Sequence, residues 1–277
     1  MERKLYSSLD VTKFLMAIAI LLSHTQNDLA TSASSIVHNL LAVSDFGVPF
    51  FFACSGFLFF TKLFVLDENA QRQYYRHFSL RLGKMYLVWT IIYTTFRLTS
   101  WLVYGVSHRE VMHFIHELIV RTSYPTLWFL PALWIGVSII YFLYQRWNNK
   151  VLLTTVILLY LLCSIGDSYH NLFSSFPLFQ SIWDWYNAIF LSFRNGVFMG
   201  APFVACGYFA AHMKEMQSNK MICLLLTIVF ALLFVVEAFI IKRYHLSVSV
   251  NCGLFLLPAT YFLMQYLLKV EIDNKTI

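Results

Sequence analysis

The stretch MICLLLTIVFALLFVVEAFII, residues 221–241, holds 21 residues, of which Glu237 is the only charged one. About 20 apolar residues in a helix cross the roughly 30 Å hydrocarbon core of a bilayer. Two further apolar runs, at 151–165 and 250–268, approach or reach that length. The whole chain is 59% hydrophobic and 12% charged, whereas soluble domains are about half apolar and a quarter charged. The sequence therefore predicts an all-α fold, a polytopic bundle of transmembrane helices.

Hydropathy predicts eight spanning helices within a single membrane-embedded domain that covers residues 1–277. They are expected at residues 9–30, 36–63, 82–104, 127–145, 150–166, 189–212, 220–241 and 248–269. Eight crossings leave both termini on one side, and that side carries fourteen of the lysines and arginines against five on the other. Because basic residues favour the cytoplasmic side, both termini are predicted to be cytoplasmic. The positive charge is thus a topology signal, with the lipid bilayer as partner and no nucleic acid.

The connection at residues 167–188 is predicted to lie at the outer membrane interface. It contains no lysine or arginine and several aromatic residues. Aromatic side chains gather where the hydrocarbon meets water.

The five cysteines predict neither a metal site nor a redox centre. They are Cys54, Cys163, Cys206, Cys223 and Cys252, all within predicted spans and without CxxC or CxxH spacing. Such isolated cysteines are typical of small apolar side chains in helix packing.

Four ionisable residues line one face of the first predicted helix. Lys13 and His24 are 11 positions apart, which is three helical turns and about 16 Å of rise. Asp10 and Asp28 extend this face at three- and four-residue spacing. Ionisable groups at membrane depth cost a few kcal/mol each unless they face a cavity or a partner, which makes the face a functional hypothesis. The alternative is that Lys13 and Asp10 extend to the lipid headgroups while His24 makes an interhelical hydrogen bond.

The sequence resembles the acyltransferase 3 family of membrane-bound acyl transferases. Five motifs carry the resemblance in order: the Lys13-to-His24 spacing after Leu9–Asp10, FGVPFFFACSGFLF (46–59), RLGKMY (81–86), YPTLWFLPALW (124–134) and FRNGVFMGAPFVACGYF (193–209). The resemblance covers nearly the whole chain. It implies a multi-pass protein of a bacterial plasma membrane that moves an acyl group, usually acetyl, from a cytoplasmic thioester donor to a glycan or similar acceptor outside.

The resemblance also implies roles for particular residues. His24 is expected to be the general base, or to carry the acyl group transiently, with Asp28 orienting its ring. Acetyl-CoA or another acyl-CoA is the expected donor, with no metal. The expected binding residues are Lys13, Arg81 and Lys84 for the donor, and Asp10, Ser55, Tyr124, Trp128 and Arg194 for the substrate.

Several of these residues also have a structural interpretation. Ser55 precedes Gly56 and so permits close helix packing. Arg194 lies at the outer end of its predicted helix, where it would anchor the chain. Tyr124 and Trp128 fit an aromatic interface belt.

Two departures from the family pattern bear on activity. The family usually has an arginine where this chain has Lys13, and an ammonium does not replace the planar guanidinium in phosphate recognition. The family's closing helices have no counterpart after Lys275. Three readings stay open: a short member of the family, a truncated chain, or a degenerate copy that has lost activity.

Transport is the competing class of function. A helical bundle with an inward-facing Lys–His–Asp face suits a carrier of a proton or a small polar solute. Some members of the family resemble membrane modules joined to an amino-acid racemase in glycopeptide-resistance systems. These 277 residues contain no racemase domain or cofactor-lysine motif, so the sequence excludes racemisation by this chain. A third class is an inactive partner protein.

Overall fold

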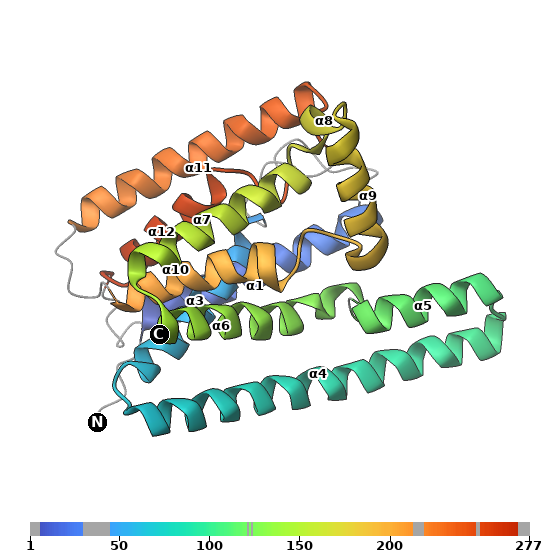
Figure 1. The fold of residues 1–277 in the computed structure, drawn as a ribbon, viewed down its shortest axis with the longest axis horizontal. Helices are drawn as coiled ribbons and strands as arrows, with labels where there is room; N and C mark the ends of the chain where they lie inside the picture. Colours follow the sequence, from blue (N-terminus) through green and yellow to red (C-terminus); the bar gives the residue numbers. More distant parts are fainter. Residues whose placement is uncertain are drawn as a thin grey trace.

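The computed structural model describes residues 6–29, 45–120, 122, 124–212, 219–247 and 250–270. Within these residues the chain forms helices joined by turns and loops, with no strand, which confirms the all-α class (Figure 1). The helices are α1 (Ser7–Leu29), α3 (Gly47–Leu63), α4 (Glu68–Tyr104), α5 (His108–Val120), η2 (Pro125–Trp128), α6 (Phe129–Arg146), α7 (Asn149–Gly166), α8 (His170–Phe173), α9 (Pro177–Phe190), the π-helical turn η3 (Gly196–Gly200), α10 (Ala201–His212), α11 (Lys220–Arg243) and α12 (Leu256–Leu267).

Helices α3 and α10 form the centre of the bundle and run parallel. A Cβ atom on Gly207 would lie 2.1 Å from the Ala53 carbonyl oxygen, and one on Gly56 would lie 2.4 Å from the carbonyl oxygen of Val204. Only glycine fits at these two positions, because any side chain would collide with the facing backbone. Glycines of this kind are how membrane helices approach closely enough to gain packing energy.

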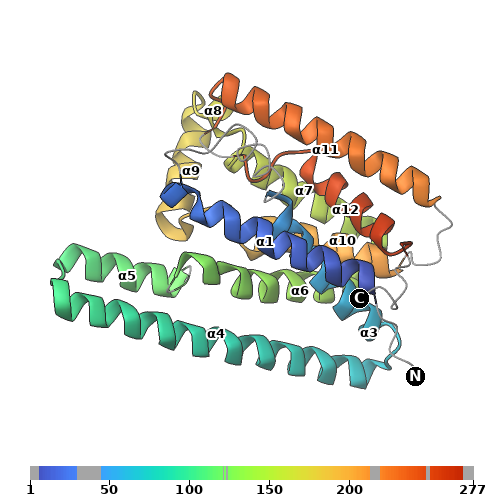
Figure 2. The ribbon, with the colours of Figure 1, turned by 180° about the vertical axis from the view of Figure 1, so that it is seen from behind.

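The other long helices surround this pair. Helices α11 and α12 pack on one side, and α4 and α6 lie on the other (Figure 1). Helix α1 crosses the face that is seen from behind (Figure 2). Aromatic side chains fill the space between the elements, such as Phe59, which packs on Phe78 of α4 at 4.8 Å between ring centroids.

Helix α4 differs from the predicted span 82–104. It is one helix of 37 residues, about 55 Å long, and it begins at Glu68, after Asp67 accepts a 2.9 Å hydrogen bond from the Ala70 N–H. Tyr75 bonds Ser138 of α6 at 2.7 Å, so α6 lies beside the first half of α4. The second half lies beside α5, which extends past the end of α6 (Figures 1 and 2). The apolar window began at residue 82 because the first turns of α4 are polar.

The predicted outer connection contains two helices. Helix α8 is short, and α9 lies across the ends of the long helices rather than along them (Figure 1). The α9 sequence PLFQSIWDWYNAIF is amphipathic, which is typical of a helix at a membrane interface. Leu191 ends α9 with a φ of 61°, a left-handed conformation that turns the chain back toward η3.

Three helical segments are long and apolar enough to cross a membrane by length and composition, counted over the described part of the chain. They are Pro125–Arg146, Asn149–Gly166 and Lys220–Arg243. Gly47–Leu63 and Gly196–His212 are shorter apolar helices. These segments and the apolar surface suggest a membrane protein. The eight crossings, the single domain and the cytoplasmic termini stay predictions.

The contact between α3 and α10 gives a test of the fold. We expect Gly207→Ala to force the two helices apart and to lower stability by about 1–3 kcal/mol, as overpacking of a core does. The matched control is Gly83→Ala in α4, where an added Cβ meets nothing within 4 Å. That change should be neutral or stabilise by up to about 1 kcal/mol. Thermal unfolding in nanodiscs measures both, and equal Tm values for the two variants would contradict the packing argument.

Candidate functional site

Helix α1 runs antiparallel along α3. Near its start, Tyr6 packs edge-on to Phe57 at 5.2 Å between ring centroids. Further along, Ile20 lies against Gly47, where α3 begins. The hydroxyl of Ser8 donates a 2.7 Å hydrogen bond to the carbonyl of Leu267 and holds the start of α1 to the end of α12. These contacts fix which residues of α1 face which level of α3.

Asp10 and Lys13 form an ion pair beside the middle of α3. The Lys13 Nζ atom lies 2.6 Å from Oδ1 of Asp10. Both charges act on Cys54, which precedes the predicted substrate residue Ser55. The structure thus brings three predicted site residues, Asp10, Lys13 and Ser55, to one level of the bundle. Helix α1 starts level with Phe57 and not with the end of α3 at Leu63, so Lys13 lies beside the middle of α3.

His24 lies at the opposite end of α1 from this ion pair. Since Ile20 faces the first residue of α3, His24 lies one turn beyond the start of α3. Its side chain is exposed. Asp28 belongs to the same helix, but its side chain is outside the described residues, so the predicted His24–Asp28 pairing stays a prediction.

Arg194 and Trp128 meet at the end of the bundle where α3 and η3 begin. The Arg194 guanidinium carbon lies 5.3 Å from the centroid of the Trp128 ring, within the range of a cation–π interaction. Among the described residues, the buried Arg194 Nε atom has no hydrogen-bond partner. The predicted substrate residues Trp128 and Arg194 are therefore in contact, and the Arg194 Nε–H group can still donate a hydrogen bond.

Asp45 joins this cluster, and the sequence analysis missed it. It lies ahead of α3, outside the helix, with Lys242 and Arg194 as the cations that act on it. Burial raises the pKa of Asp45 to about 6, and the two cations keep it from rising further. A single acidic residue before an apolar run gives no signal of its partners, which come from α11 and from the turn before η3.

The remaining predicted residues are not in this cluster. Tyr124 stacks on Tyr93 of α4, with ring centroids 4.3 Å apart and planes 6° from parallel. On α4, Arg81 lies 5.9 Å from the Phe78 ring, and both Arg81 and Lys84 are exposed. The ring contacts of Tyr124 and Arg81 are thus with residues of α4.

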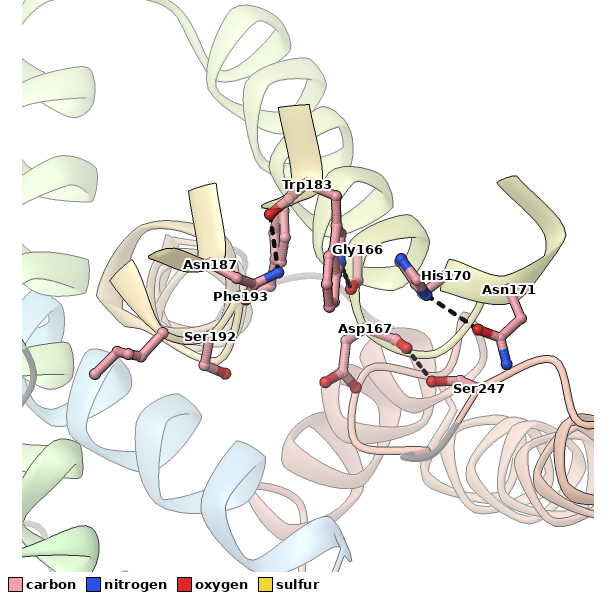
Figure 3. A pocket seen from close by; sticks show the side chains of 10 residues that line it. Gly166, Asp167, His170, Asn171, Trp183, Asn187, Ser192, Phe193 and Ser247 are labelled. Atoms are coloured by element: carbon pink, nitrogen blue, oxygen red, sulfur yellow. Dashed lines mark hydrogen bonds between the residues drawn. The ribbon is translucent and has the colours of Figure 1, made fainter. Parts of the chain in front are cut away.

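A cavity of about 420 Å³ with several polar groups in its walls opens next to the cluster (Figure 3). It lies between the end of α7, α8, α9 and the segment after α11, and it is lined by Gly166, Asp167, His170, Asn171, Trp183, Asn187, Leu191, Ser192, Phe193 and Ser247. The turn that carries Ser192 and Phe193 leads directly to Arg194. Cavities of about 300–1,000 Å³ with a few polar groups are typical small-ligand sites.

Hydrogen bonds hold the walls of this cavity together. The Trp183 indole N–H donates to the Gly166 carbonyl at 2.9 Å, and Ser247 donates to the Asp167 carbonyl, as Figure 3 shows. His170 packs on Trp183 with ring centroids 4.0 Å apart. Within the described part of the chain, its buried Nε2 atom has no hydrogen-bond partner. An aromatic ring beside amide, hydroxyl and carboxylate groups suits a polar, hydroxyl-bearing molecule.

Glu237 shapes the same end of the bundle. It is 5% exposed and accepts hydrogen bonds from the N–H groups of Leu254 and Phe255 at 2.6 and 3.1 Å and from the Tyr169 hydroxyl. The carboxylate thereby caps α12. Glu237 therefore lies within an apolar run because its carboxylate accepts the hydrogen bonds of the chain at the start of α12.

Comparison with known families gives the class of the protein. The acyltransferase 3 family, described as an acyltransferase domain, matches residues 6–274. The chain belongs to the acyltransferase 3 family. This confirms the resemblance drawn from the five motifs, and it supports an acyltransferase.

Individual relatives carry a different name. The chain is 26% identical over 274 residues to an amino-acid racemase of Enterococcus faecalis, which covers 98% of this chain and 37% of that protein. It is 27% identical over 232 residues to a serine/alanine racemase of Enterococcus gallinarum, over 83% of this chain and 32% of that protein. The chain spans about a third of the length of these curated relatives. No solved structure matches it.

The raised pKa of Asp45 predicts a pH-dependent stability. Because this pKa is about 6 in the folded chain against 3.8 for a free side chain, the folded state holds the proton more tightly. The contribution of Asp45 to stability is therefore most favourable below pH 3.8 and is lost as pH rises through about 6. We expect Asp45→Asn to raise Tm by a few degrees at pH 8 and by less at pH 5. The same gain at both pH values would contradict the assignment.

Proposed function

We propose that this protein is an O-acyltransferase that takes an acetyl group from a cytoplasmic acyl-CoA. The acceptor is a hydroxyl on a cell-envelope glycan or a similar molecule on the outer side of the cell membrane. The family match over residues 6–274 carries this proposal. Donor, acceptor and orientation are the parts that rest on the resemblance and on chemistry.

The arrangement of charges supports transfer along α1. The Asp10–Lys13 ion pair lies at mid-length of α3, and His24 lies about 16 Å further along the same helix. The cluster of Arg194, Trp128 and Asp45 and the cavity beside it lie at the same end of the bundle as His24. A thioester that enters from the other end would pass Lys13 before it meets the imidazole.

The proposed chemistry is general-base catalysis by His24. Its neutral imidazole takes the proton of the acceptor hydroxyl as the hydroxyl oxygen attacks the thioester carbonyl carbon. The new C–O bond forms, the C–S bond breaks, and the imidazolium returns the proton to the departing thiolate. A positioned base of this kind contributes on the order of 10² to 10⁴ in rate.

The other residues bind and orient in this scheme. Lys13, Arg81 and Lys84 attract the phosphorylated donor by charge. Asp28 orients the imidazole, while Asp10 holds Lys13 and Ser55 lies beside the donor's path. Arg194 and Trp128 bind the acceptor, with Tyr124 at the edge of the same aromatic region.

A carrier of a small polar solute is the second candidate, and one observation favours it. Asp45 and Arg194 present opposite charges at one end of the bundle, as a site for a zwitterion such as an amino acid would. The relatives named as amino-acid racemases suggest the same class of solute. A carrier moves labelled serine or alanine into proteoliposomes without acyl-CoA, whereas a transferase consumes the thioester.

Release of free CoA tests the transferase. With purified protein in nanodiscs, acetyl-CoA and a mixed cell-envelope glycan fraction, we expect glycan-dependent CoA release that falls at least about 100-fold in His24→Ala, because the base is lost. The matched control is His108→Ala, an exposed histidine at the start of α5, which should keep wild-type activity.

If the wild-type and His24→Ala proteins are both folded and neither releases CoA, the case for catalysis is lost. Equal CoA release by the two proteins would show that a residue other than His24 is the general base. Solute uptake by the silent wild-type protein would then support the carrier.

A further inference from the structure

A second cavity lies at the end of the bundle where α4 begins and α6 ends. Its volume is about 590 Å³, which is within the range of small-molecule sites. It is lined by Glu68, Gln71, Arg72, Tyr75, Tyr141, Phe142, Tyr144, Gln145 and Arg146. None of these residues is among those that the sequence predicts for the donor or the acceptor. The cavity is at the opposite end of the bundle from Arg194 and the cavity of Figure 3.

Two guanidinium groups give this cavity its charge. Arg72 comes from the first turns of α4 and Arg146 from the last turn of α6. Within the described residues, neither guanidinium has a hydrogen bond or an ion pair, although Glu68 lines the same cavity. The walls therefore hold two positive charges against one negative charge. Arginine forks bind phosphate oxygens in pairs, which makes a phosphorylated molecule the natural ligand.

Aromatic rings form the rest of the wall. Tyr75 and Tyr141 stack with ring centroids 4.6 Å apart and planes 13° from parallel. The Tyr75 hydroxyl bonds Ser138, and Gln145 donates to the Tyr141 hydroxyl at 2.7 Å, so both rings are held in place. Phe142 lies beside Tyr75 and is 54% exposed. A free aromatic face next to arginines is a platform on which a nucleobase stacks.

We infer that this cavity binds the phosphorylated nucleotide end of the acyl-thioester donor, with Arg72 and Arg146 on its phosphates and Phe142 beneath its base. The inference rests on the proposed function, because it assigns the binding site of the acyl-CoA donor in that reaction. It also moves the main phosphate contacts from Arg81 and Lys84 to a different pair of arginines. Arg81 and Lys84 lie two to three turns further along α4, on its exposed surface.

The position of the cavity suits a donor whose arm runs along α3. Tyr141 lies 6.4 Å from Phe59 between ring centroids. Phe59 is five residues, or about 8 Å of rise, from the level of Cys54 and Lys13. Measured along α3, the cavity and the ion pair are thus separated by little more than the rise from Phe59 to Cys54.

An anionic lipid headgroup carries the same phosphate chemistry, and it lacks a nucleobase. The stacked rings and the free face of Phe142 favour the nucleotide over the headgroup. Nanodiscs of phosphatidylcholine, with and without phosphatidylglycerol, separate these two sources of phosphate.

Equilibrium binding of CoA, adenosine 3′,5′-bisphosphate and S-acetylpantetheine to the full chain in phosphatidylcholine nanodiscs tests the inference. We expect Arg72→Gln and Arg146→Gln each to weaken CoA and the bisphosphate at least tenfold and to leave S-acetylpantetheine unchanged. Phe142→Ala should weaken both nucleotides as well. The matched control is Arg76→Gln, an exposed arginine one turn from Arg72 that does not line the cavity, and it should bind like the wild type.

Equal nucleotide affinity in wild type and in both arginine variants would overturn the inference, even if the wild type releases CoA in the activity assay. If the two arginine variants retain less phosphatidylglycerol than the wild type but bind the nucleotides equally well, the cavity is a lipid site and the inference is overturned. Nucleotide binding that depends on Arg72 and Arg146 but survives His24→Ala supports it. If the nucleotide binds in this way but no CoA is released in the activity assay, the proposed function fails while the inference about the cavity holds.

Discussion

The close approach of α3 and α10 at Gly56 and Gly207 is the constraint on which the rest of the bundle depends. In lipid the helices gain little from hydrophobic burial, because the lipid chains are as apolar as the side chains. What holds two helices together is therefore dense packing, and here the backbone of each lies where the other would place a side chain. This contact fixes the level of every residue on the two helices relative to the other helix.

That fixed level explains the charged cluster at one end. Helices α3 and α10 run parallel, so Asp45 before α3 and Arg194 before η3 come to the same end of the bundle. Lys242 completes the arrangement from the end of α11. The cluster is thus a consequence of helix packing, and its charges come from three distant parts of the chain.

Local pattern predicted much of the fold, and pairing between helices lay beyond it. Segments 127–145, 150–166 and 220–241 match α6, α7 and α11 closely, because a long apolar run determines a helix by itself, and Asn148 and Asn219 also cap α7 and α11. The start of α4 was missed, since a polar amphipathic turn carries no hydropathy signal. At the site, periodicity placed Lys13 and His24 on α1, and the family motifs pointed to Trp128 and Arg194. Asp45, Arg72 and Arg146 depend on which helices become neighbours, and a single sequence does not contain that information.

The geometry along α1 sets a requirement on catalysis. From Phe59, which contacts Tyr141 of the cavity of Arg72 and Arg146, to the level of Lys13 is about 8 Å of helix rise, and from Lys13 to His24 is about 16 Å more. A pantetheine arm comparable to three helical turns, seated in that cavity, therefore stops short of His24. The acceptor, or the His24 end of α1, must therefore move toward the donor to close the gap. Helix α1 is bonded to α12 near its start by Ser8, while Leu21 and Leu22 near its other end are exposed. We therefore expect the part of α1 beyond its bonded start to adjust when donor and acceptor are both bound.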